Sequence, residues 1–299
     1  MKFKLSVLFI ILSFSCSDDF QSSQFCHPNQ EFNREFSVLT FNRLETTSLN
    51  SSIRLISDLS PDLVGIQESY GLGLDVASSL GYCYYGSEDS SIAFLSKYEM
   101  EFINENLVKV YFDDDKVINF FNVHFTDFPY QPYQIRDGEL TTVWQIEHES
   151  EETRRDEFQA LLSDIHNVIK DEEIILLGDF NEPSHLDWTL EAAELGLNFG
   201  FEVNWPISSV LESIGMTDSY REKHPNPIEN PGFTWTPFQS NNEVHDRIDF
   251  VYYSGNMELF LGRYFLKVIR HQFQRNSDKI VTLTSGNDGL GKFMRVRGS

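Results

Sequence analysis

The sequence has few basic residues: 23 lysines and arginines stand against 46 aspartates and glutamates, which gives a formal net charge of −23. Binding to nucleic acids of any sequence depends on lysine and arginine side chains that neutralise phosphates. The charge balance therefore counts against stable, high-affinity nucleic-acid binding, although a local metal site can offset the overall field in a nuclease. Solubility in an extracellular or saline setting is the simpler explanation for so much negative charge.

The chain also lacks features that divide a sequence into several units. It has no Gly/Ser-rich or Pro-rich linker, no low-complexity tract and no internal repeat of the solenoid type. A length of 299 residues would allow two domains, but single α/β domains of this size are common, and 26 phenylalanines supply one large core. We expect one main domain at residues 36–284, between an N-terminal tail at 17–35 and an irregular C-terminal tail at 285–299.

The apolar stretch Leu5–Phe14 at the N-terminus is too short to span a bilayer. Two lysines precede it, which is typical of a signal peptide, and we place that peptide at residues 1–16. Cys16, followed by Ser-Asp-Asp, resembles the lipidation site of bacterial lipoproteins. The prediction is an extracytoplasmic protein, either anchored to a membrane through lipidated Cys16 or secreted after ordinary cleavage.

Cysteine is scarce, because the chain has only three. If Cys16 carries lipid, Cys26 and Cys83 remain. They form either one disulfide in an oxidising compartment or two free thiols, and the sequence does not distinguish these states.

Short apolar runs alternate with a few amphipathic helices, which predicts layered α/β packing. Ser51 can cap a helix that ends before Pro61. The clearest helix is Thr153–Lys170, because its apolar residues form one stripe. The expected strands are Val38–Phe41, Leu63–Ile66, Ile92–Leu95, Val117–Phe125, Ile174–Leu177, Ile248–Tyr253 and Ile280–Leu283.

The most informative pattern is Gly178-Asp-Phe-Asn181, which closes an apolar run. Side chains repeat with a period of two along a strand, so Asp179 and Asn181 lie on one face of its tip. There a carboxylate can take or orient the proton of an attacking water, and the amide can fix the direction of approach. Such a pair alone often marks only a turn. A catalytic site is favoured by four further polar residues at or within other apolar runs: Asn42, Glu68, His124 and Asp249.

Six segments together carry a known pattern, in the same order and with the same spacing. They are Val38-Leu-Thr-Phe-Asn42, Pro61-Asp-Leu-Val-Gly-Ile-Gln-Glu68, Phe121-Asn-Val-His124, Gly178-Asp-Phe-Asn181, Asp218-Ser-Tyr-Arg221 and Asp246-Arg-Ile-Asp249-Phe. This pattern resembles the endonuclease/exonuclease/phosphatase superfamily over about residues 36–284. The resemblance implies a DNase-I-like fold, an α/β four-layer sandwich in which two central mixed β-sheets are flanked by helices, with the active site at one sheet edge.

The resemblance also implies a divalent metal ion, held by Glu68 and Asn42. Mg²⁺ takes only one or two protein carboxylates and keeps several waters, so a single strand-end glutamate suits it; Mn²⁺ and Ca²⁺ are alternatives. Some family members have an extra acidic residue two places after the asparagine, but this chain has Leu44 at that position. The expected set of metal ligands is therefore small.

The same resemblance assigns the catalytic roles. Asp179 and Asn181 would orient or deprotonate the water. His124 would donate to the scissile phosphate or the leaving group, with Asn122 in support as a phosphate-binding residue.

Two further motifs are expected to be structural. We interpret Asp218 and Arg221 as an intramolecular ion pair rather than as residues that contact the substrate. The segment Thr234–Pro237, which precedes the strand of Asp249, is expected to pack.

The last motif departs from the family pattern. Ser277-Asp278-Lys279 stands in place of a Ser-Asp-His motif, so Lys279 replaces the histidine that Asp249 would partner, while Asp278 is kept as a catalytic candidate. Lysine has a much higher reference pKa and a flexible stem, so it does not act as a general base near neutral pH, but it can bind phosphate and stabilise its negative charge. His271 is a candidate substitute that the spacing does not require.

Two hypotheses follow. The first is a secreted or lipid-anchored, Mg²⁺-dependent phosphoesterase that hydrolyses a phosphodiester or phosphomonoester by in-line attack of water. Low basicity favours a small or lipid phosphoester over nucleic acid, with an extracellular nuclease as the alternative, and the aromatic segment Phe125–Trp144 suits stacking, lipid contact or packing. The second is a catalytically weakened member that binds a ligand, because Lys279 replaces the histidine.

Overall fold

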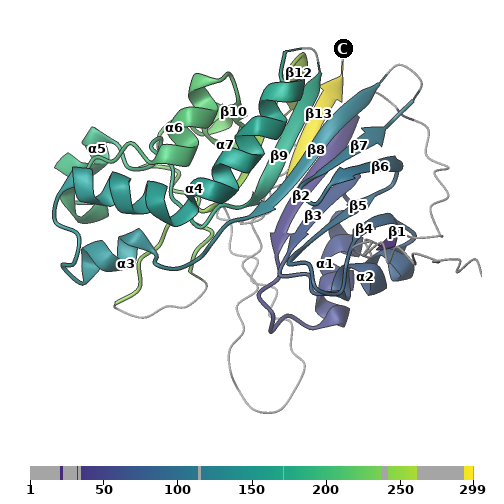
Figure 1. Ribbon diagram of the computed structural model, residues 1–299, viewed down its shortest axis with the longest axis horizontal. Coiled ribbons are helices and arrows are strands. Elements are labelled where there is room, and N and C mark those ends of the chain that lie inside the picture. Colours follow the sequence, from purple (N-terminus) through teal and green to yellow (C-terminus); the bar gives the residue numbers. More distant parts are fainter. Residues whose placement is uncertain are drawn as a thin grey trace, which may run out of the picture.

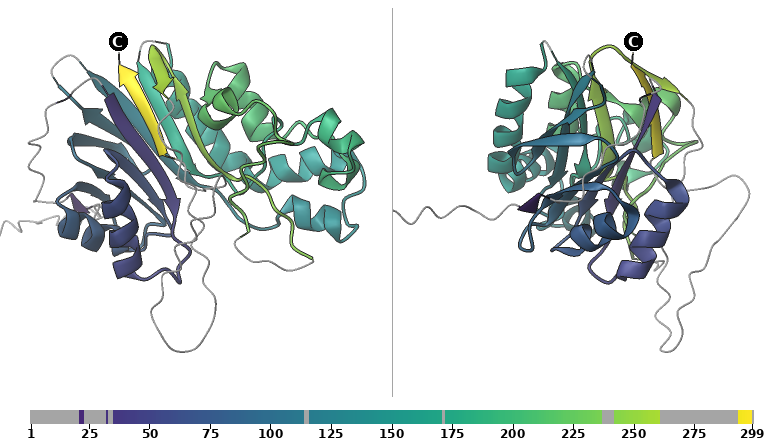
Figure 2. Two further views of the ribbon diagram at one scale, coloured as in Figure 1. Left: turned by 180° about the vertical axis from the view of Figure 1, so that it is seen from behind. Right: turned by 90° about the vertical axis from the view of Figure 1, so that its right-hand side faces the viewer.

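The computed structural model describes residues 21–22, 32, 35–113, 116–170, 172–236, 242–260 and 293–298. In this part of the chain two β-sheets face each other, and helices cover their outer faces (Figure 1). Seen from behind, the purple-blue helices and the teal-green helices lie on opposite sides of the pair of sheets (Figure 2). The expected four-layer α/β sandwich is confirmed.

The first sheet has seven strands, and only β2 and β3 run parallel among its neighbouring pairs. The helices α1 (Leu49–Leu59) and α2 (Leu72–Leu80) pack on its outer face. Ser48 rather than Ser51 caps α1, and its side chain accepts a hydrogen bond from the Ser51 N–H. The strand order is β1 (Gln21–Ser22), β4 (Cys83–Gly86), β5 (Ile92–Ser96), β3 (Leu63–Gln67), β2 (Glu35–Asn42), β13 (Phe293–Gly298) and β12 (Met257–Phe260).

The second sheet has six strands, and β8 and β9 are its parallel pair. The helices α4 (Val143–Val168) and α6 (Pro206–Ser213) pack on its outer face. The strand order is β10 (Thr217–Asp218), β11 (Asp249–Ser254), β9 (Glu173–Asp179), β8 (Val117–His124), β7 (Leu107–Tyr111) and β6 (Glu99–Asn104). The remaining helices are α3 (Gln131–Arg136), α5 (Leu190–Glu194), the 3₁₀ helix η1 (Asn198–Gly200) and α7 (Ser219–Lys223).

The helix α4 begins ten residues before the expected start at Thr153. Thr142 caps it in a capping box with Gln145, whose side chain reaches back to the Thr142 N–H. The added turns leave the sheet (Figure 1), and Ile146 packs in a separate small core with Ile135 of α3, Leu140, Trp188, Val203 and Trp205. The sequence prediction missed these turns because they bury mainly Ile146, in place of a continuous apolar stripe.

Two segments that were assigned to tails contain strands. Gln21–Ser22 pair antiparallel with β4, and Phe293–Gly298 pair with β2 on one side and β12 on the other. The prediction of an irregular C-terminal tail is therefore wrong for β13, because the preceding glycines hid a short strand that tertiary pairing stabilises. The expected strand Ile280–Leu283 lies outside the described residues.

Cys83 lies buried at the start of β4 and is disulfide-bonded. Cys16 and Cys26 lie outside the described residues, as does the proposed signal peptide. Within the ranges that the structure describes, no helix has the length and apolar character needed to cross a bilayer.

Candidate active site

Three candidate side chains form a row across the second sheet. Asp179 ends β9, and its register partners are His124 of β8 on one side and Asp249 of β11 on the other. Leu177, two residues before Asp179, belongs to the core between the sheets, so this row faces the first sheet. The structure thus brings these three residues together, as the sequence predicted.

The first sheet supplies the opposite wall of the site. Asn42 ends β2, and its Nδ2 donates a hydrogen bond to Asp179 Oδ2 at 2.8 Å. Its Oδ1 accepts from the Leu44 N–H at 2.9 Å, which fixes the orientation of the amide. This side chain therefore joins the two sheets at the edge where the candidate residues meet.

Glu68 follows β3 in a left-handed backbone conformation, with φ +56°. Its carbonyl oxygen accepts from Arg43 Nε at 2.5 Å, and its carboxylate Oε2 accepts from the Glu45 N–H at 2.6 Å. Buried Arg43 also donates to the carbonyl of Glu45 at 2.9 Å. Such a backbone costs about 1–3 kcal/mol in a residue other than glycine and persists where the surroundings enforce it, typically at functional sites.

The tip of β9 is tied to the tip of β8. Asp179 Oδ1 accepts from the Asn181 N–H at 2.9 Å, and Asn181 Nδ2 donates to the Phe125 carbonyl at 2.9 Å. A side chain at Gly178 would collide with the Val123 carbonyl oxygen, so the motif needs glycine there. The buried amide of Asn181 therefore holds the backbone of the residue after His124.

Burial raises the pKa of Asp179 from its ordinary 3.8 to about 6. Hydrogen bonds from Asn181 and Asn42 and the charge of Arg154 oppose this rise, whereas the negative charge of Glu68 adds to it. A carboxyl group with such a pKa exchanges protons near neutral pH, as a general base must. The mutual repulsion of Glu68 and Asp179 is also a feature that a bound cation would relieve.

Asn122 lies elsewhere than expected. It is fully buried between the sheets, where its Nδ2 donates to the carbonyls of Ile66 at 3.2 Å and Ala93 at 3.0 Å. Its Oδ1 accepts from Gln67 Nε2 at 2.6 Å. Contact with a phosphate would break these bonds, so we correct the assignment of Asn122 as phosphate-binding: it links the two sheets beneath the site.

Asp218 and Arg221 form ion pairs, but with other partners than each other. Arg221 Nε lies 2.5 Å from Asp187 Oδ1, and Arg247 Nη1 lies 2.6 Å from Asp218 Oδ2. Arg247 also pairs with Asp187 at 2.8 Å, so one network joins all four side chains. Asp218 and Arg221 are therefore structural ion-pair residues, as expected, but Asp218 pairs with Arg247 and Arg221 pairs with Asp187.

Thr234 does more than pack. Its Oγ1 accepts from the backbone N–H groups of Ile248 at 3.0 Å and Asp249 at 3.1 Å. The hydroxyl thus aligns the start of β11, where Asp249 joins the row. Asp278, Lys279 and His271 lie outside the described residues.

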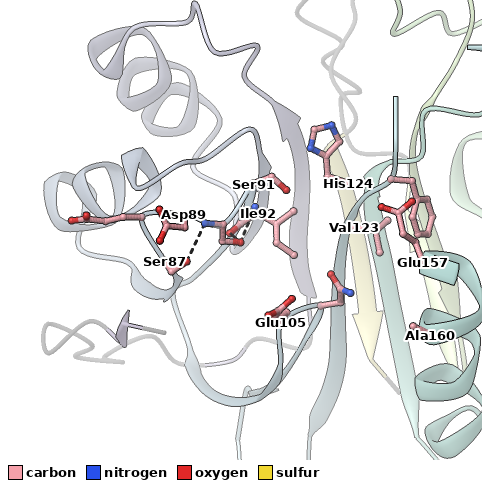
Figure 3. A pocket seen from close by; sticks show the side chains of 13 residues that line it. Ser87, Asp89, Ser91, Ile92, Glu105, Val123, His124, Glu157 and Ala160 are labelled. Atoms are coloured by element: carbon pink, nitrogen blue, oxygen red, sulfur yellow. Dashed lines mark hydrogen bonds between the residues drawn. The ribbon is translucent and has the colours of Figure 1, made fainter. Parts of the chain in front are cut away.

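An open cavity of about 740 Å³ lies beside the row (Figure 3). His124 is part of its lining, and the other walls come from the loop between β4 and β5, the turn between β6 and β7, and α4. Among its described lining residues there is no lysine or arginine. The lining includes four carboxylates: Glu88, Asp89, Glu105 and Glu157.

Comparison with known proteins identifies this arrangement. Residues 46–263 match the Endonuclease/Exonuclease/phosphatase family. The chain belongs to this family. Its fold is therefore the DNase-I-like fold, and the family consists of hydrolytic phosphoesterases that typically use divalent metal ions.

Similar proteins support the family and the fold. The uncharacterized protein F14F9.5 of Caenorhabditis elegans is 28% identical over 222 residues, which cover 66% of this chain and 70% of that protein. An endonuclease/exonuclease/phosphatase from Beutenbergia cavernae DSM 12333 has a TM-score of 0.53 at 13% identity, covering 88% of this chain and 72% of that one. An AP endonuclease from Archaeoglobus fulgidus has a TM-score of 0.52 at 13% identity, covering 87% and 98%. At these identities the two structures show the fold alone.

The residues present fit a divalent cation with oxygen ligands. The Glu68 carboxylate and the Asn42 amide oxygen belong to strand ends that meet at Asp179. The described residues contain no group of three or more His, Cys, Asp or Glu side chains placed to enclose a metal. An ion held here would keep several waters, which suits Mg²⁺ better than metals that need a complete protein cage.

Sequence reasoning missed two buried arginines, Arg43 and Arg154. Nothing in the pattern marks Arg43, whose role depends on the loop geometry around Glu68. Arg154 had a signal: it lies four residues before Phe158, on the same stripe as Leu161 and Ile165. A charged residue on the apolar stripe of a helix indicates a buried polar contact.

Proposed function

We propose that this protein is a metal-dependent phosphoesterase in which Asp179 activates water for in-line attack on phosphorus. One observation carries the proposal: Asp179 is a buried carboxylate with a pKa of about 6, aligned with His124 and Asp249 and bonded to Asn42 of the other sheet. A purely structural aspartate at a strand tip would gain nothing from a second carboxylate, Glu68, close enough to raise its pKa.

The residues divide the chemistry between them. Glu68 and Asn42 would hold the cation, which supplies charge stabilisation to the phosphoryl oxygens when bound. Asp179 accepts the proton of water while its two hydrogen-bonded oxygens keep the carboxylate fixed. His124, next in the row, donates a hydrogen bond to the phosphate or a proton to the leaving group.

The proposed substrate is a small or lipid phosphoester rather than a nucleic acid. The cavity beside His124 is lined by carboxylates, and the whole chain carries a formal net charge of −23. Both features repel a polyanion that extends beyond one phosphate. A compact alcohol with neutral or cationic substituents suits this cavity better than a neighbouring nucleotide does.

We also propose an extracytoplasmic location, with lipidated Cys16 as a membrane anchor. The support is the sequence of residues 1–16, with its lysines, its short apolar stretch and a cysteine at its end.

A hydrolysis screen tests the function. The full chain is assayed with bis-p-nitrophenyl phosphate, sphingomyelin, inositol phosphates, nucleotides, DNA and RNA, each with Mg²⁺ and with EDTA. We expect Mg²⁺-dependent turnover that is faster on small or lipid esters than on nucleic acids. Equal rates with EDTA would rule out the metal, faster turnover of DNA or RNA would overturn the substrate class, and no turnover of any ester would favour the ligand-binding alternative.

A further inference from the structure

Arg154 is buried on α4, with 1% of its surface exposed, directly behind the candidate site. Its Nη2 donates to the backbone carbonyl of Asn181. Its Nη1 donates to Gln131 Oε1 at 2.9 Å and lies 3.3 Å from Ser150 Oγ, to which it also donates. One guanidinium thus bonds to three segments of the chain.

Two of these segments leave the row of candidate residues, and the third, Ser150, belongs to α4 itself. Asn181 belongs to the loop that follows Asp179, and Gln131 begins α3, at the end of the loop that follows His124. Gln131 Nε2 in turn donates to the Pro129 carbonyl at 2.8 Å, inside that second loop. Both loops are therefore anchored to α4 through the same side chain.

The third segment adds a countercharge. Ser150 Oγ donates to the buried carboxylate of Glu182, whose other oxygen accepts from the Ile207 N–H at the start of α6 at 2.8 Å. Glu182 raises the pKa of Arg154, but burial dominates and lowers it overall. The Ser150 hydroxyl thus lies between the charges of Arg154 and Glu182. Arg154 bonds to the loop 179–182 at Asn181, and Glu182 of the same loop bonds to α6.

Fold stability alone does not explain why an arginine is buried at this position. Removing a guanidinium from water carries a penalty of several kcal/mol, and packed apolar residues often serve a fold as well as a buried charge does. Arg154 Nε is also buried without a hydrogen-bond partner among the described residues. A leucine or methionine would continue the stripe of Phe158 without either cost.

We propose that Arg154 is a positioning residue for hydrolysis. It holds the carbonyl of Asn181 and so maintains the left-handed backbone there, with φ +48°. That backbone aims the Asn181 N–H at Asp179 and its side chain at the Phe125 carbonyl, next to His124. Arg154 thereby sets the spacing of Asp179 and His124 without touching the substrate. The inference rests on the proposed phosphoesterase function.

Kinetics of matched variants on the full chain test this role. Arg154→Met removes the donors and keeps most of the stem, and Arg154→Lys keeps the charge. Arg155→Met is the control, because the neighbouring Arg155 forms its ion pairs on the surface of α4, with exposed Glu151 and Glu152. With bis-p-nitrophenyl phosphate and Mg²⁺, we expect kcat of Arg154→Met to fall at least about tenfold with KM little changed, since misplacement of reacting groups by about 1 Å costs up to about a hundredfold. Arg154→Lys should recover part of the loss, and Arg155→Met should match the wild type.

Hydrogen exchange followed by mass spectrometry supplies a readout that does not depend on turnover. In Arg154→Lys, which retains a buried charge and is the variant used if Arg154→Met does not fold, exchange should rise in peptides that contain residues 179–182 and 125–131, and stay unchanged in β2 and α1. An unchanged kcat in Arg154→Met, or unchanged exchange in these loops, would overturn the role of Arg154. An inactive wild type whose loops respond as described would sink the proposed function and leave the positioning contact established.

Discussion

At the scale of single residues, several groups of the candidate site adopt states that are unfavourable in isolation. Asp179 is a carboxylate kept out of water, and Glu68 and Asn181 have left-handed backbones that L-residues rarely adopt. Neighbouring hydrogen bonds enforce each of these states. Changes at these positions should therefore separate activity from stability.

Glu68→Gln should abolish Mg²⁺-dependent turnover and leave the fold intact. The amide has the same shape and can still accept the hydrogen bond from the Glu45 N–H, but it lacks the charge that the ion requires. Turnover and far-UV circular dichroism check the two parts. Glu45→Gln is the matched control, because its contribution is a backbone N–H; full activity of Glu68→Gln would remove this residue from the metal site.

Asp179→Asn should lower turnover at least about a hundredfold, the scale of losing a positioned acid–base group, and should also change how stability depends on pH. The pKa of Asp179 in the folded protein is raised to about 6, so between pH 4 and 6 the unfolded chain releases this proton first and the stability of the wild type falls as pH rises. The variant lacks this loss. In EDTA, the unfolding free energy of the variant should therefore rise relative to that of the wild type by up to about 3 kcal/mol from pH 4 to pH 7.

Urea unfolding of both proteins at several pH values measures that shift. Asp246, whose pKa burial also raises to about 6, titrates in both proteins and cancels in the difference. Parallel stability curves for wild type and variant would show that Asp179 is not the perturbed group.

At the scale of elements, the site depends on how closely the tips of the parallel strands β8 and β9 approach. Gly178 makes that approach possible, because its φ of +148° and the neighbouring Val123 carbonyl leave no room for a side chain. The closeness of these tips explains how Asn181 of one strand reaches Phe125 after the other.

Gly178→Ala should therefore destabilise the fold by at least about 2 kcal/mol more than Gly138→Ala, because overpacking adds to backbone strain. Gly138 is the matched control: its φ is also positive, at +77°, but an added Cβ meets nothing within 4 Å. Thermal or urea unfolding compares the two. Equal losses would mean that strain alone explains the glycine.

The sequence was informative about elements wherever a local pattern carried the information. Short apolar runs located β2, β3, β8 and β9. Family motifs located His124 and Asp179 at the ends of β8 and β9 and Asp249 at the start of β11. Other features depend on contacts between distant segments. The first turns of α4 pack against α3 and Trp205, and Asn122 donates a hydrogen bond to a strand of the facing sheet. Arg154 bonds to the loop that follows β9, far from it in sequence.

At the scale of the whole molecule, the negative charge of the chain bears on the proposed membrane attachment. A lipid anchor at Cys16 would hold a strongly acidic domain at a surface, where contact with anionic lipid is unfavourable and zwitterionic lipid is tolerated. The carboxylates around the cavity beside His124 likewise disfavour an anionic lipid headgroup relative to a zwitterionic one.

If Cys16 carries lipid as proposed, Cys16→Ala should release the protein from membranes into the soluble fraction, because the acyl chains supply the membrane affinity. Fractionation followed by immunoblotting measures this, with Cys26→Ala as the control. Retention of the Cys16→Ala variant in the membrane fraction would require a protein partner or an uncleaved N-terminal segment instead.

The place of β13 between β2 and β12 has a consequence for how the chain folds. β2 carries Asn42 and comes early in the chain, whereas the strand that covers its edge comes from the far end. At synthesis rates of about 5–20 residues per second, β2 emerges roughly 13–50 seconds before this partner. Until then its edge is open to pairing with other chains. A holdase chaperone, or export of the chain before it folds, would protect that edge during synthesis.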